Sequence, residues 1–212
     1  MLAQSAQCAD VQPLFQEDFE KTVADRWKQL PFDFDPPTDY QVVVENSNAC
    51  LRGYAKGDAS AYVTKLNIAS SNVTTFSWRW KISGCPTNGS DDKSKTFDHA
   101  GRVFVAFDTF IGPPYSINYV WANNAPTNST FNHPMTSRSR FIVLQSGNAR
   151  AGQWVNEKRD LKQDWQRLFN DKPIPNIVGI GLFTDSDGTK APLTGWYDDL
   201  LLEGQVSKRS LR

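Results

Sequence analysis

The sequence lacks the features that membrane insertion and nucleic-acid binding need. No apolar run approaches the roughly 20 residues that a membrane-spanning helix needs, so we expect no membrane span. Lysine and arginine together number 23, and aspartate and glutamate together also number 23. This balance gives the chain no general attraction for nucleic acid or anionic lipid. We therefore expect no nucleic-acid partner.

Cysteine and histidine are scarce, and the common catalytic motifs are missing. Cys8, Cys50 and Cys85 have no CxxC spacing, and both histidines lie far from them in sequence, which argues against a zinc site. The three thiols fit either one disulfide with one thiol left over, or three unpaired thiols. The chain contains no GxSxG or GxxxxGK motif, and no ExDxxE run of the kind that sandwich hydrolases carry. We therefore assign no catalytic residue.

The chain does contain many short strand-like segments and seven tryptophans. Short apolar or alternating runs separated by turn residues are typical of an all-β protein. One helix is expected after Asp160, because this capping residue precedes Leu161, Trp165 and Leu168 at helical spacing. The expected strands cover residues 14–20, 40–45, 49–55, 59–66, 76–82, 103–107, 117–121, 140–146, 153–156, 177–184 and 195–203. The pattern predicts an antiparallel two-sheet sandwich of jelly-roll type with one short helix.

The ends of the chain differ in composition from its centre. Residues 1–12 are rich in small residues, like the end of a secretory signal without its apolar core. We interpret them as a residual export segment and expect a periplasmic or extracellular protein with a trimmed signal peptide. A single sandwich domain is predicted over residues 13–204, and residues 205–212 are predicted to form a flexible basic tail.

A series of motifs resembles one known family. In order they are SWRWKI, DHAGRVFVAF, INYVW, FIVLQSG, Trp154 followed by RDLKQDW, and GIGLFTDSD. Together they resemble the bacterial secreted domains called domain of unknown function 3047, over residues 15–203. The resemblance implies a β-sandwich related to concanavalin-like and carbohydrate-binding jelly rolls, and it implies no reaction. It also implies an acidic residue at position 99 and asparagine at position 188 in many members, where this chain has His99 and Gly188.

Tryptophans near polar residues are the candidates for glycan binding. Sugar rings stack on flat indoles, while amides, carboxylates and guanidinium groups take the hydroxyls. We expect Trp78, Trp80 and Trp165 in the core and Trp121, Trp154 and Trp196 facing a ligand. The polar and aromatic candidates beside them are Arg102, Tyr119, His99 and Asp98.

Acidic residues at the two ends of the domain are candidates for a structural calcium site. Calcium is bound by six to eight oxygens, several of them carboxylate. Glu17 and Asp18 on the first strand could meet Asp198 and Asp199 on the last, and a metal there would clamp the termini. The DSDGT turn offers Asp185 and Asp187 as a second possibility.

The sequence favours a non-catalytic extracytoplasmic binding module that recognises glycan through exposed aromatic residues. One alternative is a structural or accessory subunit of an envelope or extracellular complex, because exposed Trp, Tyr and Arg also bind protein partners. Another alternative is a polysaccharide lyase or hydrolase, with His99 or Tyr119 carrying a proton and Arg102 neutralising a uronate. The alternative to a functional role for His99 and Asp98 is a structural one, in which they form hydrogen bonds between a loop and a strand.

Overall fold

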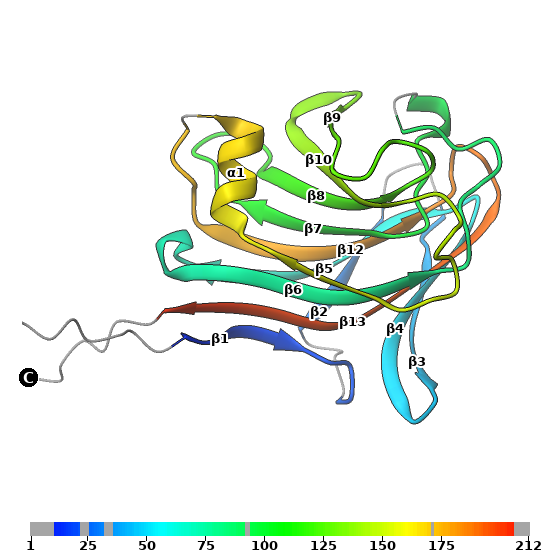
Figure 1. The fold of residues 1–212 in the computed structure, drawn as a ribbon, viewed down its shortest axis with the longest axis horizontal. Helices are drawn as coiled ribbons and strands as arrows, with labels where there is room; N and C mark the ends of the chain where they lie inside the picture. Colours follow the sequence, from blue (N-terminus) through cyan, green and yellow to red (C-terminus); the bar gives the residue numbers. More distant parts are fainter. Residues whose placement is uncertain (1–10, 22–25, 32–35, 92–93, 171, 206–212) are drawn as a thin grey trace, which may run out of the picture.

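The computed structural model describes residues 11–21, 26–31, 36–91, 94–170 and 172–205, which form two stacked β-sheets (Figure 1). The six-stranded sheet has the order β11-β6-β13-β4-β3, with β1 also paired to β13, and the seven-stranded sheet has the order β2-β5-β12-β7-β8-β10-β9. The first strands are β1 (Val11–Glu17), β2 (Trp27–Pro31), β3 (Asp39–Glu45), β4 (Asn48–Lys56), β5 (Ala59–Ile68) and β6 (Val73–Ile82). The others are β7 (Arg102–Phe107), β8 (Tyr115–Ala122), β9 (Thr130–His133), β10 (Thr136–Ser146), β11 (Val155–Arg159), β12 (Ile177–Asp185) and β13 (Pro192–Gln205).

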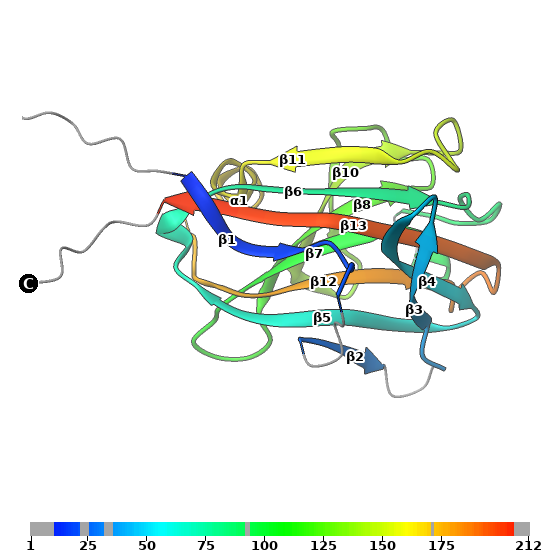
Figure 2. The ribbon, with the colours of Figure 1, turned by 90° about the horizontal axis from the view of Figure 1, so that it is seen from below.

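The predicted two-sheet sandwich with one α-helix is confirmed over the described residues. Two strands were expected as loops: β2, which pairs with β5, and β9, which pairs with β10. One pair of neighbouring strands, β8 and β10, runs parallel instead of antiparallel. Figure 2 shows the two layers from below, with β1, β6 and β13 in one sheet and β5, β7 and β12 in the other. Residues 1–10, on which the export prediction rests, lie outside the described part, as do residues 206–212.

The main core lies between the two sheets, where the alternating side chains of β6 point inward. Phe76, Trp78, Trp80 and Ile82 are each at most 2% exposed, as their spacing of two residues predicts. The expected helix is α1 (Leu161–Phe169), and the Asp160 side chain accepts hydrogen bonds from the Lys162 and Gln163 backbone N–H groups. Among the described residues, no helix has the length and apolar character needed to cross a membrane.

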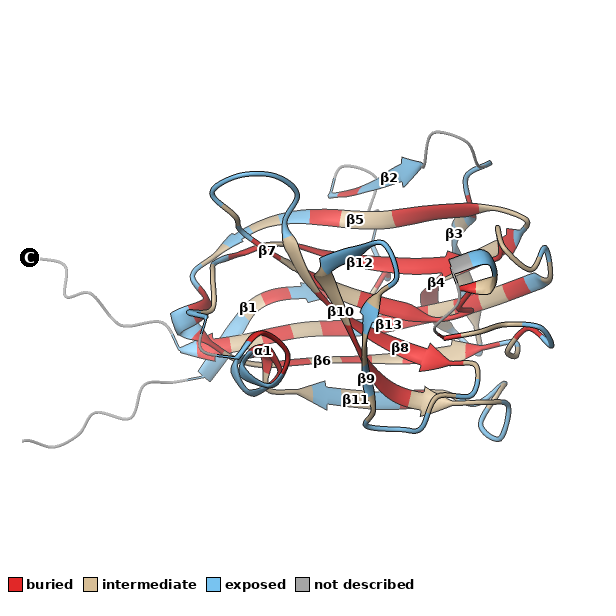
Figure 3. Cartoon of the chain, turned by 90° about the horizontal axis from the view of Figure 1, so that it is seen from above, coloured by how far each residue is buried: buried red, intermediate tan, exposed pale blue. Residues whose placement is uncertain are grey.

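The outer face of the seven-stranded sheet carries a second apolar layer. Alternate positions of β5, β8, β10 and β12 face away from the main core and pack together with Phe97, which precedes β7. They form two smaller clusters, one around Phe97, Phe141 and Val143 and the other around Ala61 and Phe183. Figure 3 shows the molecule from this side, with the edge strands β9 and β10 of this sheet crossing in front of its other strands. Because β9 covers this face, a cavity can form beneath it.

Candidate functional site

A cavity of about 410 Å³ lies on the outer face of the seven-stranded sheet, within the range of 300–1,000 Å³ typical of ligand pockets. Its walls come from the segment before β7, the end of β12 and the turn between β9 and β10. The lining residues are Ala59, Phe97, Asp98, Arg102, His133, Pro134, Met135, Phe183, Asp185 and Asp187. The cavity therefore combines charged groups with aromatic and aliphatic surface.

Strand register brings the two charged segments together. Arg102 begins β7 and lies opposite Phe183 of β12, and Asp185 at the end of β12 lies opposite Ala59 of β5. Both segments are anchored to the core, because the strands that carry them are buried between neighbours. Residues more than 80 positions apart in sequence thus meet on one rigid surface.

Asp98 fixes the turn that follows β12. Its carboxylate accepts hydrogen bonds from the backbone N–H of Gly188, at 3.0 Å, and from that of Thr189. The turn lies so close that a Cβ atom at position 188 would be 2.5 Å from the Lys95 carbonyl oxygen. Glycine at 188 therefore allows the close approach, and the asparagine expected in relatives would require this backbone to shift.

Arg102 is the one arginine or lysine among the described cavity-lining residues, and it is only 7% exposed. Its guanidinium carbon lies 3.6 Å from the centre of the Phe183 ring and 5.6 Å from that of Phe141. One guanidinium nitrogen, Nη2, is 3.9 Å from Asp185 Oδ2. The ring contacts favour a positive charge at this buried position.

Asp185 is the strongly perturbed acid of the cavity, and it is 4% exposed. Burial raises the pKa of Asp185 to about 8, and the charges of Asp98 and Asp187 act in the same direction. Arg102 and the hydrogen bond from the His99 backbone N–H, at 3.0 Å, oppose this rise only in part. At neutral pH the carboxyl group is therefore mostly protonated. Perturbed acids of this kind are common at functional sites.

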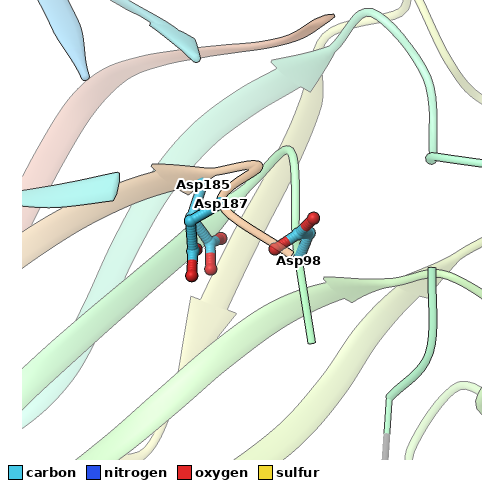
Figure 4. Close-up of side chains that lie close together, drawn as sticks. All are labelled: Asp98, Asp185 and Asp187. Atoms are coloured by element: carbon cyan, nitrogen blue, oxygen red, sulfur yellow. The ribbon is translucent and has the colours of Figure 1, made fainter. Parts of the chain in front are cut away.

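Asp98, Asp185 and Asp187 each offer one oxygen, and these oxygens lie within 4.8 Å of one another. Figure 4 shows Asp185 and Asp187 side by side and Asp98 facing them from the segment that leads into β7. The sequence pattern points to Asp185 and Asp187 only as part of a turn motif. Asp98 is not predicted as their neighbour, since no sequence signal shows that β7 and β12 are paired.

His99 lies behind the cavity and is fully buried. Its Nε2 atom is 3.0 Å from Asp91 Oδ1, and its ring stacks near Phe141. Burial lowers the pKa of His99, although the hydrogen bond to Asp91 opposes this, so the ring is neutral. The prediction that His99 contacts a ligand is wrong, because the ring is enclosed by core residues. The His99 ring is bonded to a loop residue, Asp91, and the His99 backbone N–H donates to Asp185 at the end of β12.

Asp91 holds two loops together. Its carboxylate accepts hydrogen bonds from the backbone N–H groups of Asn123, Asn124 and Ala125, at 2.8 to 2.9 Å. Burial disfavours its charge, but the His99 ring and these backbone groups keep the pKa of Asp91 well below its usual value. A second cavity, of about 450 Å³, lies beside this carboxylate. We do not place the ligand site there, because both Asp91 oxygens already bind the protein.

Two aromatic residues predicted to contact a ligand lie in the main core. Trp121 is 1% exposed, and its Nε1–H donates to the Gly147 carbonyl oxygen. Tyr119 is fully buried and donates to Asp164. Both predictions are wrong, because these positions of β8 point between the sheets while Asn118 and Val120 point outward.

Trp154 and Trp196 are partly exposed, as expected, but they lie away from the cavity on the six-stranded sheet. The Lys81 Nζ atom lies 5.2 Å from the Trp154 ring centre and 4.3 Å from that of Trp196. Of the seven predicted ligand-binding residues, only Asp98 and Arg102 line the cavity.

The structure does not gather the four predicted calcium-binding carboxylates into one site. The Glu17 side chain accepts hydrogen bonds from the Phe19 backbone N–H and from the Trp27 indole, and Asp18 accepts one from the Glu20 N–H. Asp198 and Asp199 instead form ion pairs with Arg79. The prediction of a calcium site shared by Glu17, Asp18, Asp198 and Asp199 is therefore wrong, because these side chains have other partners. In the described ranges, the acidic group that could hold a metal is Asp98, Asp185 and Asp187.

The described cysteines, Cys50 and Cys85, are free thiols. Burial raises the pKa of each to about 11, so neither is a reactive thiolate at neutral pH. Cys8 lies outside the described residues.

The family described as "Protein of unknown function (DUF3047)" matches residues 25–201. The chain belongs to this family. No curated protein sequence matches the chain. The resemblance expected from the strand motifs is thus confirmed. Membership of this family names no ligand.

Solved structures share the sandwich architecture at low sequence identity. The family 11 carbohydrate-binding module of the cellulosomal cellulase Lic26A-Cel5E of Clostridium thermocellum is similar over 95% of this chain and 98% of that one, with 12% identity and a TM-score of 0.50. The xyloglucanase domain of NopAA from Sinorhizobium fredii is similar over 84% of this chain and 93% of that one, with 10% identity and a TM-score of 0.48. The likeness to the Clostridium module shows a common fold.

Proposed function

We propose that this protein binds a glycan in the cavity between β7, β12 and the β9–β10 turn. The main support for the proposal is that charged groups and apolar side chains together line this cavity of about 410 Å³. Carboxyl groups and a guanidinium group can exchange hydrogen bonds with sugar hydroxyls, while Phe97 and Met135 offer apolar surface to the C–H faces of a ring. The fold supports the proposal, because a structure of similar fold is a carbohydrate-binding module by name.

The proposed site differs from an exposed tryptophan platform. Recognition would depend on buried polar groups, because the aromatic residues of the cavity are phenylalanines and Arg102 covers one face of Phe183. Buried polar groups reject ligands that leave them unpaired, so this kind of site favours selectivity. We also propose an extracytoplasmic location and a non-catalytic role, in keeping with the composition of residues 1–12 and the absence of known catalytic motifs.

The test is glycan binding by the purified protein, measured on a glycan array and by isothermal titration calorimetry. Arg102→Gln and His133→Ala should each weaken binding by about ten-fold or more, since the first removes the guanidinium group and the second the imidazole ring from the cavity wall. Trp154→Ala, on the six-stranded sheet, is the matched control and should bind like the wild type. Denaturant unfolding of each variant separates a lost contact from a lost fold. Binding that depends on Trp154 and not on the cavity residues would refute this site.

Glycoside hydrolysis is a second candidate function, favoured by Asp185. A carboxyl group with its pKa raised to about 8, close to the second carboxyl group of Asp187, has the features of a general acid beside a nucleophile. Release of reducing sugar from mixed polysaccharides, lost in Asp185→Asn, would support hydrolysis. If glycans bind but no reducing sugar is released from them, the result supports the non-catalytic role.

A further inference from the structure

A pocket between β9, β10 and the C-terminal end of α1 is rich in positive charge. It has a volume of about 300 Å³. Since one water molecule takes about 30 Å³ of liquid, the pocket has room for a small ion and some water. Its polar lining residues are Thr130, Asn132, Arg140, Arg167 and Asn170, and no aspartate or glutamate is among the described lining residues. We call it the arginine pocket.

Strand alternation separates the arginine pocket from the proposed glycan cavity. Arg140 and Phe141 are successive residues of β10, so their side chains point to opposite faces of the sheet. Phe141 belongs to the outer apolar cluster and contacts Phe97 of the cavity wall. The Arg140 guanidinium carbon instead lies 4.6 Å from the centre of the Phe169 ring of α1. The arginine pocket is therefore a different site from the glycan cavity.

Both guanidinium groups of the pocket are held in place by other contacts. Arg140 lies on the Phe169 ring, and its Nε–H donates to the Ser137 carbonyl oxygen at 3.4 Å. One terminal nitrogen of Arg167 donates to the Asn128 carbonyl oxygen. Each guanidinium has five N–H donors, and neither makes a further hydrogen bond to a described residue. Because the groups are positioned in advance, a ligand that uses the remaining donors orders little of the protein.

Neither Arg140 nor Arg167 forms an ion pair with a carboxylate of the described residues. The arginines that do form ion pairs in this part of the chain are Arg26, Arg52, Arg79, Arg102 and Arg159. The last carbonyl groups of α1 contribute a negative charge of only about half a unit, which is less than the two full charges of the guanidinium groups. The described lining therefore attracts an anion.

We propose that the arginine pocket binds a tetrahedral oxyanion, namely a sulfate or phosphate group. Arginine binds such groups through two parallel N–H···O hydrogen bonds. A tetrahedral oxyanion has enough oxygens to accept paired bonds from Arg140 and Arg167 together, and the Thr130 hydroxyl and Asn132 amide are further donors. A carboxylate has only two oxygens, which one guanidinium already occupies. Free ions and sulfated or phosphorylated glycans share this chemistry.

The experiment is isothermal titration calorimetry of the full chain with sodium sulfate, phosphate and acetate at constant ionic strength. Sulfate and phosphate should bind at one site, and acetate should bind at least ten-fold more weakly. Arg140→Gln and Arg167→Gln should each weaken sulfate binding by about ten-fold or more, because each removes charge-assisted hydrogen bonds. Arg150→Gln, which removes an exposed arginine between β10 and β11, is the matched control and should bind sulfate like the wild type. Urea unfolding of each variant shows that a weaker binder is still folded.

A sulfated oligosaccharide and its unsulfated form distinguish the two sources of the anion. If the group belongs to a glycan, the sulfated form should bind at least ten-fold more tightly than free sulfate, and Arg140→Gln should remove this advantage. If the ligand is a free ion, the sulfated form should bind no more tightly than sulfate. Both results support the oxyanion site.

Three results would overturn the proposal. Acetate that binds as tightly as sulfate would rule out the tetrahedral anion. An equal loss of sulfate binding in Arg150→Gln and Arg140→Gln would indicate unspecific attraction to surface charge. The third result concerns Asp171, which follows Asn170 in the sequence and lies outside the described residues. Sulfate binding by Asp171→Asn but not by the wild type would mean that a carboxylate of the chain itself neutralises the pocket.

Discussion

Asp185→Asn is expected to stabilise the fold. The buried carboxyl group must stay protonated in the native state, whereas the unfolded chain ionises it freely near its ordinary pKa. An amide has the shape of the protonated acid, and its oxygen can still accept the hydrogen bond from the His99 N–H. The substitution therefore removes the cost of burying an ionisable group while it preserves that contact.

The size of the effect follows from the two pKa values. With a native pKa of about 8 and an unfolded value of about 3.9, the cost at pH 7 is at most about 4 kcal/mol. The native state holds the proton more tightly than the unfolded state, so the wild type loses stability as pH rises between about pH 4 and pH 8. Asp185→Asn should show little advantage near pH 4 and a growing advantage up to about pH 8.

Urea unfolding of both proteins between pH 4 and pH 9 measures this difference directly. We expect the difference in the free energy of unfolding to increase with pH and then to level off. A constant difference across the range would mean that Asp185 titrates normally in the folded protein. A loss of stability at every pH would show that the ionised carboxylate supports the structure through Arg102. Either result would refute the electrostatic reasoning for the cavity.

Two further predictions concern residues outside the cavity. Asp91→Ala should destabilise the protein by about 3 kcal/mol, because three backbone N–H groups and the His99 ring lose a buried acceptor. The loss should shrink as the pH falls below about 4, because the unfolded wild-type chain then binds a proton at Asp91 that the folded chain does not. Unfolding curves at neutral pH and near pH 3 check this. Trp121→Ala should lower the free energy of unfolding by about 3–5 kcal/mol, since it empties a core position. Ligand affinity of the folded fraction should stay unchanged, and a selective loss of binding would contradict the core placement.

Local patterns in the sequence are enough to predict the class of fold and most of its strands. Alternation from Phe76 to Ile82 fixes which side chains of β6 face the core, because successive residues of a strand point to opposite faces. Asp160 and the apolar spacing that follows it define the helix. These signals are local, so they can be read without knowing which segments are neighbours. The two missed strands, β2 and β9, lack such alternation and exist because a neighbouring strand offers them hydrogen bonds.

The tertiary structure alone decided where the site lies. Trp121 and Arg102 both looked suitable for a ligand, but β8 turns the indole inward while β7 turns the guanidinium outward. Asp98 and Asp185 meet because β12 pairs with β7, and pairing between distant strands leaves no mark in the local sequence pattern. The raised pKa of Asp185 likewise follows from burial and from neighbours far along the chain. Long-range pairing and desolvation thus determined the cavity, and neither is a property of any single stretch of sequence.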